Sequence, residues 1–213
     1  MMEVTIFNET FTLLPQRAMW WKKQRMLLLA DMHLGKVNHF RKAGIPVPTK
    51  ANDKNWETLV ELVQLTRPER IVCIGDLFHS HYNYDWELVG QFTRAFTQLS
   101  FELVTGNHDI LTNHQYARNN IVLHGEGFSV ESFLFSHVPL TDCPSGVYTI
   151  SGHIHPGVQL SGKGKQRITL PCFYFGEHQG YLPAFGMFTG LSRIQPIKED
   201  RIFAIADNTV IKI

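Results

Sequence analysis

The chain has few cysteines, no long apolar run and almost no net charge, and each shortage excludes a class of protein. Its three cysteines form no Cys-x-x-Cys pair, which argues against a disulfide framework and against a thiolate zinc site. Lysine and arginine number 20 against 19 aspartates and glutamates, so the chain is neither a basic nucleic-acid tail nor an acidic solvating segment. The most apolar short run, Met26–Ala30, is far shorter than a membrane-spanning helix.

The composition is typical of a folded, water-soluble domain. The chain has 213 residues, 44% of them hydrophobic, which is enough to bury a substantial core. The first residues, MMEVTIFNETF, lack the basic and then apolar regions of a secretory signal. No repeat or linker is visible. We therefore expect one domain over residues 1–213, located in the cytoplasm and without a membrane partner.

Apolar periodicity predicts alternating strands and helices in the first half and mostly strands in the second. The first half is predicted to contain a hairpin over 3–7 and 10–14, strands over 26–30, 71–75 and 101–106, and helices over 52–66 and 85–99. The second half is predicted to contain strands over 121–124, 127–130, 132–136, 147–151, 167–175, 183–188, 202–206 and 209–213. This order favours an α/β protein with mixed sheets and helices outside them.

Polar side chains that could bind metal follow five of the predicted strands. They are Asp31 and His33, then Asp76, then Asn107, then His137, and finally His153 and His155. A lone histidine after a strand is usually an ordinary loop residue, but five such strand ends in one chain are hard to explain in that way. In open α/β sheets, sites form beyond the carboxyl ends of the strands, so these side chains are predicted to converge.

The residue types at these strand ends suit divalent cations. Carboxylate, imidazole and amide oxygen ligands are those of Mn, Fe, Zn or Co. Asp31 and His33 are two residues apart, as are His153 and His155, and side chains two apart in extended backbone point to the same side. Seven ligands are too many for one tetrahedral ion and fit two ions that share a carboxylate.

Five ordered motifs carry a family resemblance. DMH (31–33), GDLFH (75–79), GNHD (106–109), SH (136–137) and GHIH (152–155) resemble the motifs of the calcineurin-like metallophosphoesterase superfamily. A finer likeness extends over residues 26–191. DMHLGK, FRKAGIPVP and LPCFYFGEHQGYLPAFGMFTG resemble the DNA-ligase-associated metallophosphoesterases, which are described as damage-response endonucleases.

The resemblance implies a fold and a ligand set. The fold is α/β, a metallophosphoesterase-type mixed β-sandwich flanked by helices (α/β/β/α). One ion would be held by Asp31, His33, Asp76 and His155, and the other by Asp76, Asn107, His137 and His153. Asp76 would bridge the two ions. Mn²⁺ is the expected cofactor, with Fe and Zn as alternatives.

The resemblance also implies an activity, which is DNA cleavage by a hydroxide that two metal ions activate. His108 would stabilise the transition state or protonate the leaving oxygen, and His79 would lie near the phosphate. For both histidines, an ordinary loop position is the alternative. The expected setting is DNA repair, with DNA as substrate and a functional association with a DNA ligase, a helicase and an exonuclease.

Positive charge gathers around the first metal motif. Residues 15–50 hold eight basic residues and one acidic residue, and phosphate backbones attract such a surface. The candidate nucleic-acid contacts are Arg17, Lys22, Lys23, Arg25, Arg41 and Lys42. Trp20 and Trp21 either stack on bases or cover the sheet, and a solvated turn is the alternative for Lys22, Lys23 and Arg25.

A second function class stays open at this point. A phosphatase or phosphodiesterase acting on a small nucleotide or metabolite would have the same core site, and the chain shows no obvious appended DNA-binding domain. A non-catalytic scaffold is the third alternative.

Overall fold

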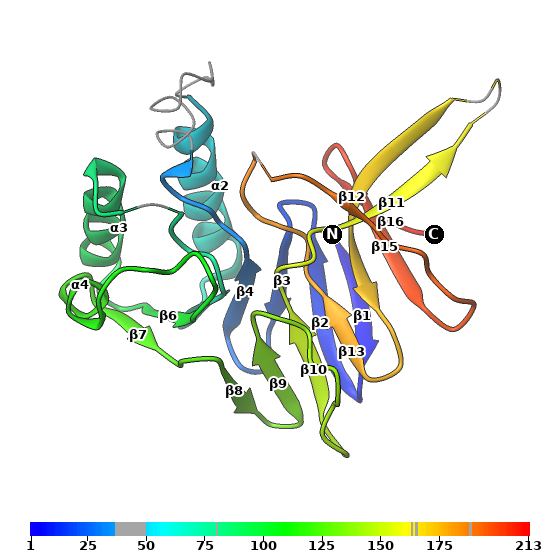
Figure 1. The fold of residues 1–213 in the computed structure, drawn as a ribbon, viewed down its shortest axis with the longest axis horizontal. Coiled ribbons are helices and arrows are strands. Elements are labelled where there is room, and N and C mark those ends of the chain that lie inside the picture. Colours follow the sequence, from blue (N-terminus) through cyan, green and yellow to red (C-terminus); the bar gives the residue numbers. More distant parts are fainter. Residues whose placement is uncertain (37–49, 80, 163, 165, 188) are drawn as a thin grey trace.

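The computed structural model describes residues 1–36, 50–79, 81–162, 164, 166–187 and 189–213. Within these residues, two β-sheets pack against each other, and helices cover the free face of the first sheet (Figure 1). The predicted class, an α/β mixed β-sandwich flanked by helices, is confirmed.

The first sheet contains seven strands in chain order. They are β1 (Met2–Ile6), β2 (Glu9–Leu14), β3 (Ala18–Trp21), β4 (Met26–Ala30), β5 (Arg70–Ile74), β6 (Ser100–Val104) and β7 (Ile121–Leu123). Strands β1 to β4 pair antiparallel, whereas β4 to β7 pair parallel. The carboxyl ends of β4, β5 and β6 therefore lie at one edge of the sheet.

The second sheet contains nine strands, and three of its strand pairs are parallel. Its strands are β8 (Gly127–Val130), β9 (Phe133–Ser136), β10 (Tyr148–Ser151), β11 (Pro156–Ser161), β12 (Arg167–Phe175), β13 (Gln179–Tyr181), β14 (Ser192–Arg193), β15 (Arg201–Ala206) and β16 (Thr209–Lys212). Strands β9 and β10 are parallel, and their last residues, Ser136 and Ser151, are register partners. Both strands therefore end at the same edge of the sheet. The loops that follow both strands leave from that edge.

Strand β4 is buried on both faces, as its uninterrupted apolar sequence predicts. Leu27 and Leu29 belong to the cluster that the helices cover. Leu28 and Ala30 belong to the cluster between the sheets, which Phe133 and other residues of the second sheet complete. Alternation along one strand thus joins the two layers of the core.

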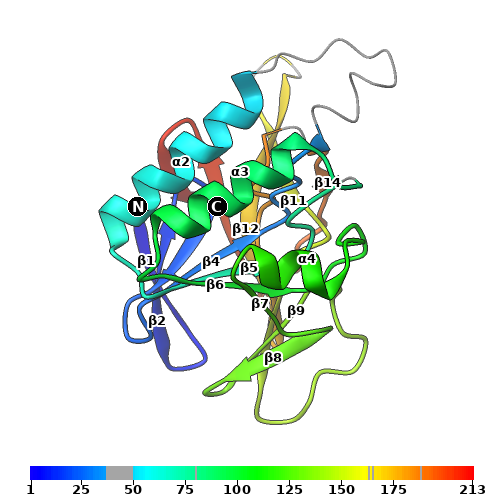
Figure 2. The ribbon, with the colours of Figure 1, turned by 90° about the vertical axis from the view of Figure 1, so that its left-hand side faces the viewer.

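Three helices lie in the described part of the chain, namely α2 (Lys50–Thr66), α3 (Tyr84–Ala95) and α4 (Asn113–Arg118) (Figure 2). Asn83 caps α3 by accepting a hydrogen bond from the backbone of Asp85. Thr112 and Gln115 form a capping box at the start of α4. Leu59, Leu62 and Trp86 are among the side chains that these helices pack onto the first sheet.

The predicted elements match the structure with a few differences. Helix α3 ends at Ala95, earlier than predicted, because the backbone of Phe96 leaves helical geometry. Strands β3, β11, β13 and β14 and the short helix α4 were not predicted. The prediction of a strand over 183–188 is wrong for its described part, 183–187, which forms no strand. Instead, Phe185 and Gly186 each donate one backbone hydrogen bond, to Ala30 at the end of β4 and to Asp31 just after it.

None of the described helices is long and apolar enough to cross a membrane.

Candidate metal centre

The seven predicted ligands meet where strands of both sheets end. Asp31 and His33 follow β4, Asp76 follows β5, Asn107 follows β6, His137 follows β9, and His153 and His155 follow β10. The parallel pairing of β4, β5 and β6, and of β9 with β10, places these residues at a common edge. The convergence expected from the sequence is therefore what the structure has.

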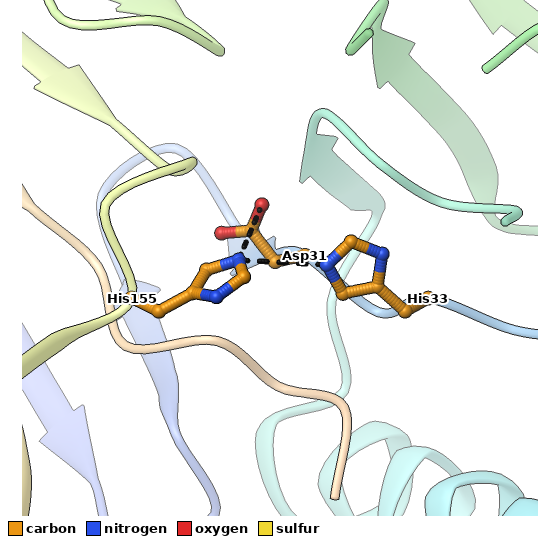
Figure 3. Close-up of side chains that lie close together, drawn as sticks. All are labelled: Asp31, His33 and His155. Atoms are coloured by element: carbon orange, nitrogen blue, oxygen red, sulfur yellow. Dashed lines mark hydrogen bonds and ion pairs between the residues drawn. The ribbon is translucent and has the colours of Figure 1, made fainter. Parts of the chain in front are cut away.

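Asp31, His33 and His155 form one group, in which a ligand atom of each lies within 4.8 Å of the others. Their side chains point toward one another (Figure 3). The Nε2 atom of His155 lies 3.4 Å from Oδ1 of Asp31 and 3.4 Å from Nε2 of His33. Two imidazole nitrogens and a carboxylate oxygen that converge in this way are suited to a single cation.

Asp31, Asp76 and His137 form a second group under the same 4.8 Å limit. The Nε2 atom of His137 lies 3.5 Å from Oδ1 of Asp76. The same nitrogen lies 3.0 Å from Oδ1 of Asn107 and 3.2 Å from Nδ1 of His153. All four residues predicted for the second ion are therefore in contact with one another through His137.

Two carboxylates reach both groups. Asp31 belongs to each of them, which the sequence did not indicate. Asp76 has one oxygen on each side, with Oδ2 3.9 Å from Nε2 of His33 and Oδ1 3.5 Å from Nε2 of His137. Asp76 thus lies between the two groups, where a bridging ligand is expected. Asp31 is a second carboxylate that lies close to both groups.

The backbone at the centre adopts left-handed conformations that are unfavourable for residues with a side chain. Thirteen described non-glycine residues have a positive φ, and five of them belong to the predicted ligand set. These five are Asp31, His33, Asp76, His153 and His155. Each such conformation costs on the order of 1–3 kcal/mol, and strain of this kind commonly clusters at functional sites.

Close packing of the backbone holds the ligands in place. The backbone N–H of Asp31 donates to the carbonyl of Gly75 at 3.1 Å. The backbone N–H of His153 donates to the carboxylate of Asp31, at 3.1 and 3.0 Å from its two oxygens. A Cβ atom on Gly75 would lie 1.9 Å from Nδ1 of His137, so only glycine fits the GD motif at this position.

Burial sets the charge of the centre. Asp31 is 0% exposed and Asp76 is 2% exposed. Burial lowers the pKa of His33 to about 2, with further lowering from Lys36 and neighbouring histidines, so its imidazole is neutral. Imidazole nitrogens and an amide oxygen around two buried Asp side chains are a donor set that divalent cations fit and compensate.

His79 and His108, the two predicted catalytic residues, lie beside this ligand set. Their ring centroids are 3.8 Å apart, and both rings contact His33, at 5.3 and 5.7 Å. The backbone N–H of His108 donates to Oδ1 of Asp76 at 2.9 Å. The side chain of His108 is 42% exposed, with Nε2 4.0 Å from Oδ2 of Asp76, so it faces both the centre and solvent.

Two further residues support the site. The carboxylate of Asp109 accepts hydrogen bonds from the backbone of Phe78 and Gly106, and burial raises its pKa to about 7. It thereby joins the Asp76 loop to the Asn107 loop, in keeping with the orienting role expected of a carboxylate next to a ligand. Lys36 was not predicted as a site residue, although it ends the motif DMHLGK. Burial lowers its pKa, and the nearby charges of Asp76 and Asp31 partly offset that.

The turn that carries Lys22, Lys23 and Arg25 lies at the opposite end of β4 from Asp31. Lys23 pairs with Glu9, 2.5 Å away, and lies 3.8 Å from Glu131, while Arg25 pairs with Glu69 at 2.9 Å. The structure therefore does not bring this turn to the metal centre. Arg41 and Lys42 lie outside the described residues.

The other aromatic and basic candidates for nucleic-acid binding make contacts within the protein. Trp21 is completely buried between the sheets, and Trp20 packs against the helix-side core, so the sheet-covering alternative holds for Trp21. The guanidinium of Arg17 donates to the carbonyl of Ala184 at 3.2 Å and lies 3.5 Å from that of Gly186.

With this geometry established, comparison with known proteins identifies the class. The model of the calcineurin-like phosphoesterase family matches residues 24–203, and the chain belongs to that family.

The solved structures that are similar to this chain include a nuclease and a phosphoesterase. The nuclease MPE of Pseudomonas putida shares 26% sequence identity, with coverage of 100% of this chain and 99% of that chain and a TM-score of 0.83. Yfce, a phosphoesterase from E. coli, shares 11% identity, with coverage of 88% and 97% and a TM-score of 0.47. No curated protein sequence matches the chain.

Proposed function

We propose that this phosphoesterase cuts DNA phosphodiesters as an endonuclease and that two divalent cations serve as its cofactor. The observation that carries the proposal is the convergence of Asp31, Asp76 and five Asn and His side chains at one edge of the fold. The similarity to a nuclease over the whole chain supports the substrate class.

The contacts divide the inferred metal ligands into two sets, one for each ion. Asp31, His33 and His155 would hold one ion, and His137, Asn107 and His153 the other, with Asp76 facing both. Manganese is the ion we propose, because the donors are oxygen and imidazole nitrogen without thiolate. Such ions, when bound, polarise a phosphate and lower the pKa of a water molecule.

The protein side chains then position the substrate and move protons. His108 is exposed on one side and adjoins Asp76 on the other, so its imidazole can donate a proton to the leaving oxygen of a bound phosphodiester. The ring of His79 lies against that of His108 at an interplanar angle of 38° and restricts the orientation of the His108 ring. Lys36 adds positive charge next to the two carboxylates, where a substrate phosphate would bind.

A small phosphoester is the second candidate substrate. The observation that favours it is the position of the turn with Lys22, Lys23 and Arg25 at the far end of β4, where Lys23 and Arg25 are paired with glutamates. A substrate of one or two nucleotides would not need a basic surface beyond the centre itself.

A role in DNA repair in the cytoplasm, beside a DNA ligase, a helicase and an exonuclease, belongs to the same proposal. It is supported by the DNA-ligase-associated motifs over residues 26–191. Loss of the gene should then sensitise cells to DNA damage, and unchanged survival would contradict this role.

The decisive experiment compares substrates with Mn²⁺ supplied. Circular and linear DNA, each single- and double-stranded, are tested beside mononucleotides and a chromogenic phosphodiester. Cleavage of circular DNA indicates an endonuclease, whereas hydrolysis of the small esters alone favours the second candidate. His108→Ala is the matched variant, since it leaves the ligand set intact. Equal inactivity of both proteins towards all substrates would favour the scaffold alternative.

A further inference from the structure

Residues 184–186 form a short backbone brace behind the ligand Asp31. The N–H of Phe185 donates to the carbonyl of Ala30 at 2.8 Å, and the N–H of Gly186 donates to the carbonyl of Asp31 at 3.1 Å. The approach is close, because a Cβ atom on Gly186 would lie 2.6 Å from the carbonyl oxygen of Met32. The brace therefore contacts the backbone of Asp31 and of its two neighbours in the chain, Ala30 and Met32.

Arg17 holds the opposite side of this brace. It lies in the turn between β2 and β3, at the same end of the sheet as Asp31, because β3 runs antiparallel to β4. Its Nη1 atom donates to the carbonyl of Ala184 at 3.2 Å and lies 3.5 Å from that of Gly186. Its side chain is partly buried, and burial lowers its pKa. Arg17 itself has a left-handed backbone, with a φ of 61°, which directs the chain into this turn.

A second side chain also binds the brace. The hydroxyl of Thr189 donates to the carbonyl of Gly186 at 2.9 Å. The N–H of Gly186 thus donates to Asp31, and its carbonyl accepts from Thr189 and lies near Arg17. A displacement of the brace would consequently shift the backbone of Asp31.

We propose that Arg17 is a positioning residue for the metal centre, acting through residues 184–186 on Asp31, and not a contact for nucleic acid. The inference rests on the proposed function, since it concerns the same centre. Asp31 has a left-handed φ of 52° and belongs to both groups of candidate ligands, so its placement affects both ions. Partners behind a metal ligand commonly change metal affinity by roughly 10- to 100-fold.

The chain offers a matched control in Arg25. This arginine lies at the other end of β4, also in a turn with a left-handed φ, and its Nη2 donates to a backbone carbonyl, that of Arg67, at 3.3 Å. It differs in the partners of its side chain, which within the described chain are Arg67 and Glu69 and not residues 184–186. Arg25→Ala removes the same chemical group without touching the brace.

The test measures Mn²⁺ affinity of Arg17→Ala and Arg25→Ala by isothermal titration calorimetry, with circular dichroism of the metal-free proteins to establish folding. We expect Arg17→Ala to bind Mn²⁺ roughly tenfold or more weakly than the wild type. Arg25→Ala should bind as the wild type does. Arg17→Lys, which keeps a donor for the carbonyl of Ala184, should recover part of the affinity. If Arg17→Ala does not fold, Arg17→Lys and Arg17→Gln are compared in the same way.

Activity separates positioning from nucleic-acid binding. A positioning role predicts equal losses on DNA and on a small phosphodiester at subsaturating Mn²⁺, with recovery at high Mn²⁺. A nucleic-acid contact predicts a loss on DNA alone and a smaller salt dependence.

Unchanged Mn²⁺ affinity in a folded Arg17 variant overturns the inference and leaves the proposed function intact. Wild-type protein that binds no Mn²⁺ and cuts no substrate overturns the proposed function itself.

Discussion

Both ends of strand β4 carry polar and charged residues but arrange them in opposite ways. At the carboxyl end, Asp31 and His33 are buried, left-handed in backbone and close to Asp or His side chains from three other strand ends. At the amino end, Lys23 and Arg25 are exposed and form surface ion pairs with glutamates. Burial, and not the number of charges, therefore distinguishes the site from the surface turn.

The energetic difference between the ends follows from solvent. Exposed ion pairs such as Arg25–Glu69 are screened by water and contribute little. Buried carboxylates without a compensating cation are costly, and a bound metal removes that cost. Changes at the carboxyl end should accordingly have large effects on metal binding and hydrolysis, and changes at the amino end small ones.

The largest expected effect comes from Asp76→Ala, which removes the carboxylate that faces both groups. Hydrolysis should fall on the order of 10³-fold, because charge stabilisation at the phosphate is lost. The stabilisation by Mn²⁺, about 2.7 kcal/mol at a hundred times Kd, should also be lost. Chemical unfolding with and without Mn²⁺, together with rate measurements, tests both outcomes.

Asp207→Ala is the control for that substitution. Asp207 also has a left-handed backbone, with a φ of 50°, but lies in the turn between β15 and β16. It should leave the response to Mn²⁺ unchanged. Full activity of Asp76→Ala would be incompatible with a bridging carboxylate.

An intermediate effect is expected from acid in the metal-free protein. The pKa of His33 is about 2 in the folded chain, below its ordinary value of 6.5, because burial disfavours the charged ring. The unfolded chain therefore takes up a proton below pH 6.5 that the folded chain does not, and stability falls as pH falls. From pH 6.5 to pH 5 the loss attributable to His33 is about 2 kcal/mol.

Urea unfolding in the presence of a chelator measures this loss. His33→Asn should reduce the difference in unfolding free energy between pH 6.5 and pH 5. His178→Asn, at a histidine whose side chain is 68% exposed, should not change it. Identical pH dependence in the wild type and His33→Asn would show that burial of His33 does not control acid stability.

The smallest effect is expected at the amino end of β4. Combined substitution of Lys22, Lys23 and Arg25 by alanine removes charges that lie roughly 16 Å from the centre, the length of a five-residue strand. That distance exceeds the Debye length of about 10 Å at 0.1 M salt, so cleavage of DNA and of a small ester should each change less than about threefold. Rates at two salt concentrations test this. A loss of tenfold or more on DNA alone would instead identify the turn as a nucleic-acid contact.

Much of the centre was predictable because strand ends are local features of the sequence. The apolar runs before Asp31, Asp76 and Asn107 identify the strands, and parallel pairing brings their ends together. The capping box of Thr112 and Gln115 could have identified α4 in the same way. The sequence did not place the basic turn, because residues near in sequence to Asp31 lie a whole strand away from it in space.

The segment 183–187 illustrates the limit most clearly. Its apolar residues favour a strand, yet Phe185 and Gly186 bond to β4 only where that strand ends, so no ladder forms. The role of Arg17 was inaccessible for the same reason, since its partner Ala184 is 167 positions away in the chain.

The sequence by itself determined which residues are candidate metal ligands, since residue type and the apolar strands that precede these residues are encoded locally. Only the tertiary structure decided that Asp31 belongs to both ligand groups and which arginine faces inward. Those outcomes depend on how two sheets and a distant loop pack together, and packing at that range leaves no periodic pattern in the chain.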